Sequence, residues 1–354
     1  MFTREADLFC KVIDNYGDAG FSLRLARDLC LRGMHLRLFC DHPEIVKKIA
    51  SASDLASQKL KILPWPEAQT YHPAGTVLEA FSCRLNEELL QKIRQAQPLL
   101  IAVDYLCAEK FVEECHGLPT YADGLKGYFF FPGFTSRTGG LIVEDEFKQL
   151  CLNHQEATDD GCRPLQISLF CYQNSKLENL LNFLKKSSRS CEVTAFLGQT
   201  STELGRIYQK NLAENEVISD HNLRIRISRM LSQPDYDHLL LNSDLNLVRG
   251  EDSFVRAQLC GKPFLWQIYV QDEEYHKVKL EAFFRTMQQI LPSEDISTFE
   301  ALDLAYCGFG NFLDKLNPDE FLTDWRRITA GWAAYLHSLK PLGEALIDFI
   351  IAKS

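Results

Sequence analysis

Residues 245–269 read LNLVRGEDSFVRAQLCGKPFLWQIY and contain one complete example of the pattern that runs through the chain. The apolar run Leu245–Gly250 precedes a helical pattern at Ser253–Cys260, and a second apolar run follows at Pro263–Tyr269. Short apolar runs that alternate with helical patterns are typical of βαβ units. These residues therefore predict two parallel strands joined by a helix.

The same alternation predicts strands and helices on both sides of a polar, aperiodic stretch at Asn153–Arg163, which we interpret as a linker. The other predicted strands are Asp7–Ile13, His35–Cys40, Lys59–Leu63, Thr76–Phe81, Pro98–Leu106, Gly127–Phe134, Leu165–Tyr172, Cys191–Gly198 and Leu223–Ser228. Helices are predicted around Phe21–Leu29, Asn86–Ala96, Ala108–Cys115, Ser175–Lys186 and Asp235–Asn242, and from Glu273 to the end. The sequence thus predicts an α/β fold with two Rossmann-like domains that face each other. Ligands of such sheets bind beyond the carboxyl ends of the strands, so we expect the site in the cleft between the domains.

Length, charge and composition exclude several classes of protein. The chain has 354 residues and a formal net charge of −10. That length favours two domains, and the acidic balance argues against nucleic-acid binding. The apolar stretches are shorter than the roughly 20 residues that span a bilayer. Glu5 and Asp7 interrupt the apolar core that a signal peptide needs, so we expect a cytoplasmic protein without a membrane partner.

Cysteines and histidines show no metal-binding spacing. The twelve cysteines include no Cys-x-x-Cys pair, and the nine histidines form no His-x-x-x-His pair. We therefore expect free thiols and no metal site.

The first predicted strand is followed by DNYGDAG, residues 14–20, which we interpret as a loop before a helix. Gly17 and Gly20 would allow a tight turn and a close approach of a ligand. Asp14 and Asp18 place two carboxylates on this loop. One interpretation is structural, with Asp18 capping the helix and Asp14 forming an Asx turn. The other is chemical, with the pair acting as a general base or binding a cationic group.

A second loop, VRGEDS, also lies between a strand and a helix. Ser253 is a suitable N-cap, and the free N–H groups of the helix beyond it, together with Arg249, suit a phosphate. Glu251 and Asp252 could accept hydrogen bonds from sugar hydroxyls, and Gly250 forms the turn. The alternative is a well-capped structural helix whose acidic first turn suits its dipole.

A third candidate is the pair of aromatic residues Phe170 and Tyr172 at the end of a strand. Alternation places both rings on one face. They are either core residues or a surface that packs against a nucleotide.

Four stretches of the chain together carry a specific resemblance: FCKVIDNYGDAGFSLRLAR (9–27), GYFFFPGFTSRTGGLI (127–142), SLFCYQN (168–174) and VRGEDSFVRAQLCGKPFLWQIYVQDEEYH (248–276). They resemble the bacterial protein-arginine rhamnosyltransferases that modify translation elongation factor P. The resemblance implies a GT-B glycosyltransferase that needs no metal or other cofactor. It further implies the donor dTDP-β-L-rhamnose, an arginine of elongation factor P as acceptor, and inversion of the anomeric centre. Residues 1–155 would then form the acceptor domain, 163–335 the donor-nucleotide domain, and 336–354 a helix that packs back on the first domain.

The resemblance also implies roles for individual residues. On the acceptor side, Asp18 takes the place of the catalytic base and Asp14 that of its partner. Glu251 matches an essential acidic residue near the donor. On the donor side, the implied contacts are Asp252 and Ser253 around the diphosphate, Phe170 and Tyr172 as pocket aromatics, Gln233 at the nucleotide, and Met230 where the family has a phenylalanine that stacks on thymine. Methionine can still pack against a base through its thioether, so the departure concerns base recognition rather than the type of reaction.

Two other functions remain open on the sequence alone. One is a GT-B transferase with another nucleotide sugar and a different acceptor. The other is a two-domain binding protein without chemistry, which would predict an export signal and would have no use for paired acids opposite a phosphate site.

Overall fold

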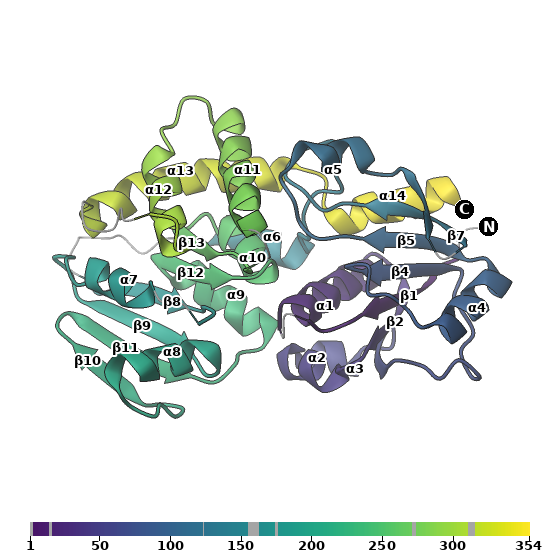
Figure 1. The fold of residues 1–354 in the computed structure, drawn as a ribbon, viewed down its shortest axis with the longest axis horizontal. Coiled ribbons are helices and arrows are strands. Elements are labelled where there is room, and N and C mark those ends of the chain that lie inside the picture. Colours follow the sequence, from purple (N-terminus) through teal and green to yellow (C-terminus); the bar gives the residue numbers. More distant parts are fainter. Residues whose placement is uncertain are drawn as a thin grey trace. The chain divides into compact units, whose positions relative to one another are not determined.

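The computed structural model describes residues 3–13, 16–122, 124–154, 163–173, 176–270, 274–310 and 316–354. The chain divides into two compact units, each an α/β sheet with its own helices (Figure 1). Unit 1 consists of residues 1–146 and 338–354, and unit 2 of residues 147–337. The chain passes from one unit to the other within helix α6 (Asp145–Asn153) and returns at the end of α13 (Pro318–Ser338). These crossings lie at 146/147 and 337/338, whereas the predicted borders were at 155–163 and 335/336.

Unit 1 contains a seven-stranded sheet with the order β3-β2-β1-β4-β5-β7-β6. All neighbouring pairs are parallel except β6 and β7. The strands are β1 (Glu5–Cys10), β2 (His35–Cys40), β3 (Leu60–Pro64), β4 (Thr76–Ala80), β5 (Leu99–Val103), β6 (Pro119–Ala122) and β7 (Leu125–Phe130). The helices are α1 (Tyr16–Leu31), α2 (Pro43–Ile49), α3 (Ala52–Ala56), α4 (Glu87–Ala96), α5 (Lys110–Cys115) and α14 (Leu342–Lys353).

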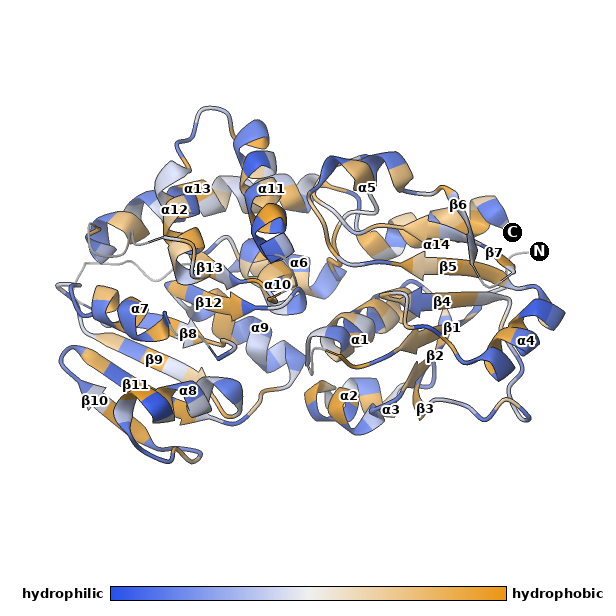
Figure 2. Cartoon of the chain, in the orientation of Figure 1, coloured by the Kyte–Doolittle hydropathy of each residue, from blue (hydrophilic) through white to orange (hydrophobic). Residues whose placement is uncertain are grey.

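The two faces of this sheet are covered by different helices. Alternate residues of β1, such as Leu8, pack with α1 and with Leu342, Leu346 and Ile350 of α14 in one core. Phe9, the next residue after Leu8 in the strand, lies in a second core with buried residues of α4. Since successive side chains of a strand point to opposite faces, the sheet is buried on both sides. Strand β5 is accordingly hydrophobic along its length in Figure 2, whereas the amphipathic α4 is largely hydrophilic outside.

Unit 2 contains a six-stranded sheet with the order β10-β11-β9-β8-β12-β13, in which only β10 is antiparallel to its neighbour. The strands are β8 (Leu165–Leu169), β9 (Cys191–Phe196), β10 (Val217–Asp220), β11 (Leu223–Ser228), β12 (Leu245–Arg249) and β13 (Phe264–Gln267). The helices are α7 (Leu177–Leu184), α8 (Gln199–Tyr208), α9 (Gln233–Asn242), α10 (Asp252–Leu259), α11 (Tyr275–Ile290), α12 (Ser297–Tyr306) and α13. The opening βαβ prediction is confirmed, because β12 and β13 are parallel neighbours joined by α10.

Two local predictions are wrong at helix starts. Helix α1 begins at Tyr16, so Gly17, Asp18 and Gly20 lie in its first turns rather than in a loop. Ser253 is not the N-cap of α10; Glu251 occupies that position without a capping side-chain bond. The alternation also missed short or less periodic elements, namely α2, α3, α6, α8, β6 and β10.

The described part of the chain contains no helix that is long and apolar enough to cross a membrane. Its eleven cysteines are all free.

Candidate functional site

The acidic start of α1 lies at the carboxyl end of β1 in unit 1. The Ile13 N–H donates to Asp18 Oδ2 at 2.7 Å, and the Cys10 thiol donates to the Asp18 carbonyl at 3.6 Å. Asp18 is therefore held in the first helical turn, where the positive end of the helix dipole favours a carboxylate. Its predicted partner Asp14 lies outside the described residues.

Arg249, the last residue of β12, organises the segment that follows the neighbouring strand β8. Its guanidinium carbon lies 4.2 Å from the centre of the Phe170 ring and 4.6 Å from that of the Tyr172 ring. One of its nitrogens donates to the Cys171 carbonyl at 3.1 Å. Arg249 is only 6% exposed, so these cation–π contacts are largely shielded from water. The structure thus brings Arg249 together with the aromatic pair, which the sequence singled out separately.

The backbone of residues 170–172 is fixed by the next two strands on one side of β8, β12 and β13. The Phe170 N–H donates to the Leu247 carbonyl at 2.8 Å, and the Tyr172 N–H donates to Gln267 Oε1 at 2.8 Å. Gln267 ends β13 and was not predicted as a site residue. The contact of its side chain with the Tyr172 backbone could not be predicted from sequence spacing, because the two residues are 95 positions apart.

The turn between β12 and α10 is shaped by Gly250, whose φ of 63° lies in the left-handed region that favours glycine. Its carbonyl accepts a hydrogen bond from the Trp266 indole at 2.7 Å. The Ser253 hydroxyl donates back to the Arg249 carbonyl, so it closes the turn instead of capping the helix. Glu251 is half-buried at the N-cap position of α10, at the same end of this helix.

The N-termini of α9 and α10 are linked by their first residues. Gln233 Nε2 donates to Asp252 Oδ2 at 3.4 Å, and Gln233 is buried. Ser232 caps α9, since its hydroxyl accepts the Asp235 N–H. Two helix N-termini therefore lie at the same edge of the sheet, and the positive ends of their dipoles suit an anion. Met230, two residues before the cap, is half-buried.

Two aromatic residues that the sequence analysis did not select complete the edge. Phe196 ends β9 and Tyr236 lies in α9, and their ring centres are 5.5 Å and 6.1 Å from that of Phe170. The Tyr236 hydroxyl is buried and has no hydrogen-bond partner in the described part of the chain. Burial and the nearby Asp252 carboxylate raise the pKa of Tyr236, so its hydroxyl keeps its proton and is a donor. Its position three residues after Gln233, on the same face of a helix, is the signal that could have found it.

The edge of unit 2 gathers groups whose chemistry suits a nucleotide-like anion. It offers aromatic rings, two helix N-termini, a buried guanidinium and acidic side chains that can accept from hydroxyls. Among the described residues, no group of three or more His, Cys, Asp or Glu side chains could hold a metal ion.

Comparison with known proteins gives a relation over nearly the whole length. A family model described as elongation-factor P (EF-P) rhamnosyltransferase EarP matches residues 6–351. The protein-arginine rhamnosyltransferase of Pseudomonas aeruginosa is 34% identical over 369 residues, covering 97% of this chain and 98% of that protein. The enzyme of the same name from Pseudomonas putida is 37% identical over 300 residues, covering 78% and 80%.

Among solved structures, the one that describes EarP-mediated arginine glycosylation of translation elongation factor EF-P matches with a TM-score of 0.69. It is 24% identical and covers 99% of both chains. The fold is therefore that of GT-B glycosyltransferases. Since the family model and the relatives cover the chain almost from end to end, the chain belongs to the EarP family of elongation-factor P rhamnosyltransferases.

Proposed function

We propose that this chain transfers L-rhamnose from dTDP-β-L-rhamnose to one arginine side chain of elongation factor P, with inversion of the anomeric centre. The observation that carries the proposal is the end-to-end relation to the protein-arginine rhamnosyltransferase of P. aeruginosa. Translation takes place in the cytoplasm, which is therefore the compartment that this acceptor requires.

The proposed donor site is the edge of unit 2. The rings of Phe170 and Tyr172, held by Arg249, would pack against the nucleotide, with Met230 on the thymine side. The N-termini of α9 and α10 would hold the diphosphate through backbone N–H groups near Gln233 and Ser253. We propose that this positive environment makes a metal unnecessary, because it stabilises the charge of the leaving diphosphate.

The proposed acceptor site is the acidic start of α1. Arginine is a poor nucleophile because its guanidinium is delocalised and stays protonated, with a pKa above about 12. Asp18, with Asp14, would bind the guanidinium through charge-assisted hydrogen bonds and orient one nitrogen. As that nitrogen bonds to the anomeric carbon, the carbon–oxygen bond to the diphosphate breaks. The diphosphate takes the electron pair, and Asp18 accepts the proton.

Glu251 is proposed to act on the donor sugar. It is half-buried at the N-cap of α10, next to the helix end that would hold the diphosphate. A carboxylate there can accept hydrogen bonds from sugar hydroxyls and stabilise the positive charge that develops on the ring. We expect changes at Glu251 to lower both donor affinity and turnover.

The test is transfer in vitro with purified chain, elongation factor P and dTDP-β-L-rhamnose. We expect a mass gain of one deoxyhexose on intact elongation factor P, mapped by peptide fragmentation to a single arginine. NMR of the product peptide should show an α-linked sugar. Elongation factor P with that arginine replaced by lysine is the matched control and should gain nothing. Transfer from a different nucleotide sugar only, or a gain on another acceptor only, would favour the alternative GT-B activity.

A further inference from the structure

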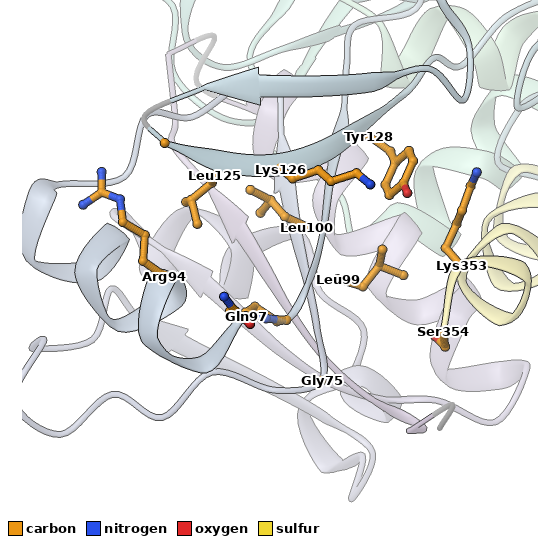
Figure 3. Close-up of a pocket in the computed structure, with 12 residues that line it drawn as sticks. Gly75, Arg94, Gln97, Leu99, Leu100, Leu125, Lys126, Tyr128, Lys353 and Ser354 are labelled. Carbon is orange, nitrogen blue, oxygen red and sulfur yellow. The ribbon is translucent and has the colours of Figure 1, made fainter.

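Unit 1 contains an open groove of about 660 Å³ at the edge of its sheet where β5 and β7 begin. The groove is lined by residues at or near the first residues of β5 and β7, including Leu99 and Lys126. Arg94 of α4 and Lys353 of α14 also line it (Figure 3). Because β1, β4, β5 and β7 run in parallel, this edge is opposite to the edge where β1 ends and α1 begins. The groove is thus separate from Asp18 and from the proposed acceptor site.

Positive charge gathers in this groove although the whole chain carries a net charge of −10. Lys126 and Lys353 flank the Tyr128 ring (Figure 3), with their ammonium nitrogens 5.8 Å and 4.6 Å from the ring centre. No carboxylate of the described residues forms an ion pair with either lysine, and no described Asp or Glu side chain lines the groove. Two ammonium groups and a phenol hydroxyl, all of which can donate to an anion, therefore lie at the same end of the groove.

A second polar group lies at the other end of the groove. Arg94 is held by Glu87 at 2.6 Å and lies near Gln97, which caps the end of α4 in a left-handed conformation. Gly124, whose φ of 72° favours glycine, lies beside Arg94. Leu99 and neighbouring leucines form the wall between the two ends. The groove therefore has two lysines at one end, an arginine that is paired with Glu87 at the other, and an apolar middle.

We propose that this groove binds a small polyanion with a phosphate or carboxylate group at each end. Its volume lies within the range of about 300–1,000 Å³ that is usual for small-molecule sites. One acidic group would lie between Lys126, Tyr128 and Lys353, and the other near Arg94 and Gln97. Both rings that contact Lys353, those of Tyr128 and Phe349, already face a cation, so the site suits an anion better than a stacked base.

The first test is calorimetry at low salt with inorganic tripolyphosphate and with citrate, which separate a phosphate ligand from a carboxylate one. The proteins are the full chain, Lys126→Gln/Lys353→Gln, and the control Lys47→Gln/Lys48→Gln, which removes the same charge from exposed positions of α2. We expect the groove variant to bind at least one probe about tenfold more weakly or worse, because it loses two charged donors, and the control to bind like the wild type. Equal affinities in all three proteins for both probes would refute the site. Unit 2 is identical in all three proteins, so any binding of the probes to unit 2 contributes equally to the three measured affinities.

The second test locates the binding. Pyridoxal 5′-phosphate condenses with lysine amines and is fixed by borohydride, and digestion then maps the modified residues. We expect Lys126 and Lys353 to react faster than Lys47 and to be protected by the probe that binds. A lack of protection at both lysines would place the binding elsewhere and overturn the proposal.

Discussion

Asp18→Asn removes one negative charge from the first turn of α1 and leaves the size of the side chain nearly unchanged. Asp18 is 3% exposed, and its Oδ2 accepts the Ile13 N–H at 2.7 Å. The asparagine oxygen can keep this bond, so the variant loses its charge-assisted part and the favourable dipole contact. We expect a loss of about 1–2 kcal/mol in the free energy of unfolding, which a folded domain tolerates.

The effect on transfer should be much larger than the effect on stability. General-base catalysis contributes about 10²–10⁴-fold in rate, and a neutral amide can neither accept the arginine proton nor attract the guanidinium. The rate of deoxyhexose gain on elongation factor P should therefore fall by about that factor. Binding of dTDP, measured by calorimetry, should remain unchanged because the proposed nucleotide site lies in unit 2.

Asp28→Asn is the matched control, since it neutralises another buried acid of the same helix. Asp28 is 1% exposed, and burial raises its pKa to about 6 despite its bond to Arg32. Its Oδ2 has no hydrogen-bond partner among the described residues, so a neutral side chain suits this position. Asp28→Asn should transfer at the wild-type rate. Wild-type transfer by Asp18→Asn, or an equal loss in both variants, would refute the role assigned to Asp18.

Three further predictions concern the nucleotide site and the pH dependence of stability. Arg249→Lys should weaken dTDP binding about tenfold in calorimetry, because an ammonium cannot cover the Phe170 and Tyr172 rings and also hold the backbone between them; unchanged affinity would contradict this. Met230→Phe should tighten dTDP binding about two- to tenfold by adding an aromatic contact with the base, and an unaltered affinity would place residue 230 away from it. The pKa of Asp28 rises from 3.8 unfolded to about 6 folded, so the folded chain holds this proton to higher pH. The free energy of unfolding should therefore fall by about 3 kcal/mol as the pH rises through that window, and denaturant titrations of Asp28→Asn should lack this contribution, whereas parallel pH profiles would exclude it.

Local pattern predicted the strands well and the helix starts poorly. Strand Leu223–Ser228 was predicted to the residue because its side chains alternate strictly between buried and exposed. The start of α1 was misplaced because Gly17 and Gly20 weaken a helical pattern, although both lie inside the helix. At α10, Ser253 has the side chain of an N-cap but uses it on the Arg249 carbonyl. Several bonding partners compete for one hydroxyl, and sequence spacing does not decide between them.

The residues of the candidate site were predicted where they follow strands and missed where they come from elsewhere. Phe170 and Tyr172 follow the end of β8 and Arg249 is the last residue of β12, and ligands of parallel sheets bind at such strand ends. Phe196 and Tyr236 were missed because their contact with Phe170 joins three separate elements. Likewise, no motif marks the groove between Arg94 and Lys353, since residues of α4, β5, β7 and α14 come to line it only after folding.

The alternation of the longer strands and helices, the acidic pair after the first strand and the polar turn after β12 were determined by the amino-acid sequence, because apolar periodicity and residue chemistry are local properties. Only the tertiary structure decided that one guanidinium holds the Phe170 and Tyr172 rings, that Gln233 meets Asp252, and that two lysines from distant segments flank Tyr128. Each of these contacts depends on which strands become neighbours in a sheet. That order results from burying both faces of each sheet at once, which no single segment can specify.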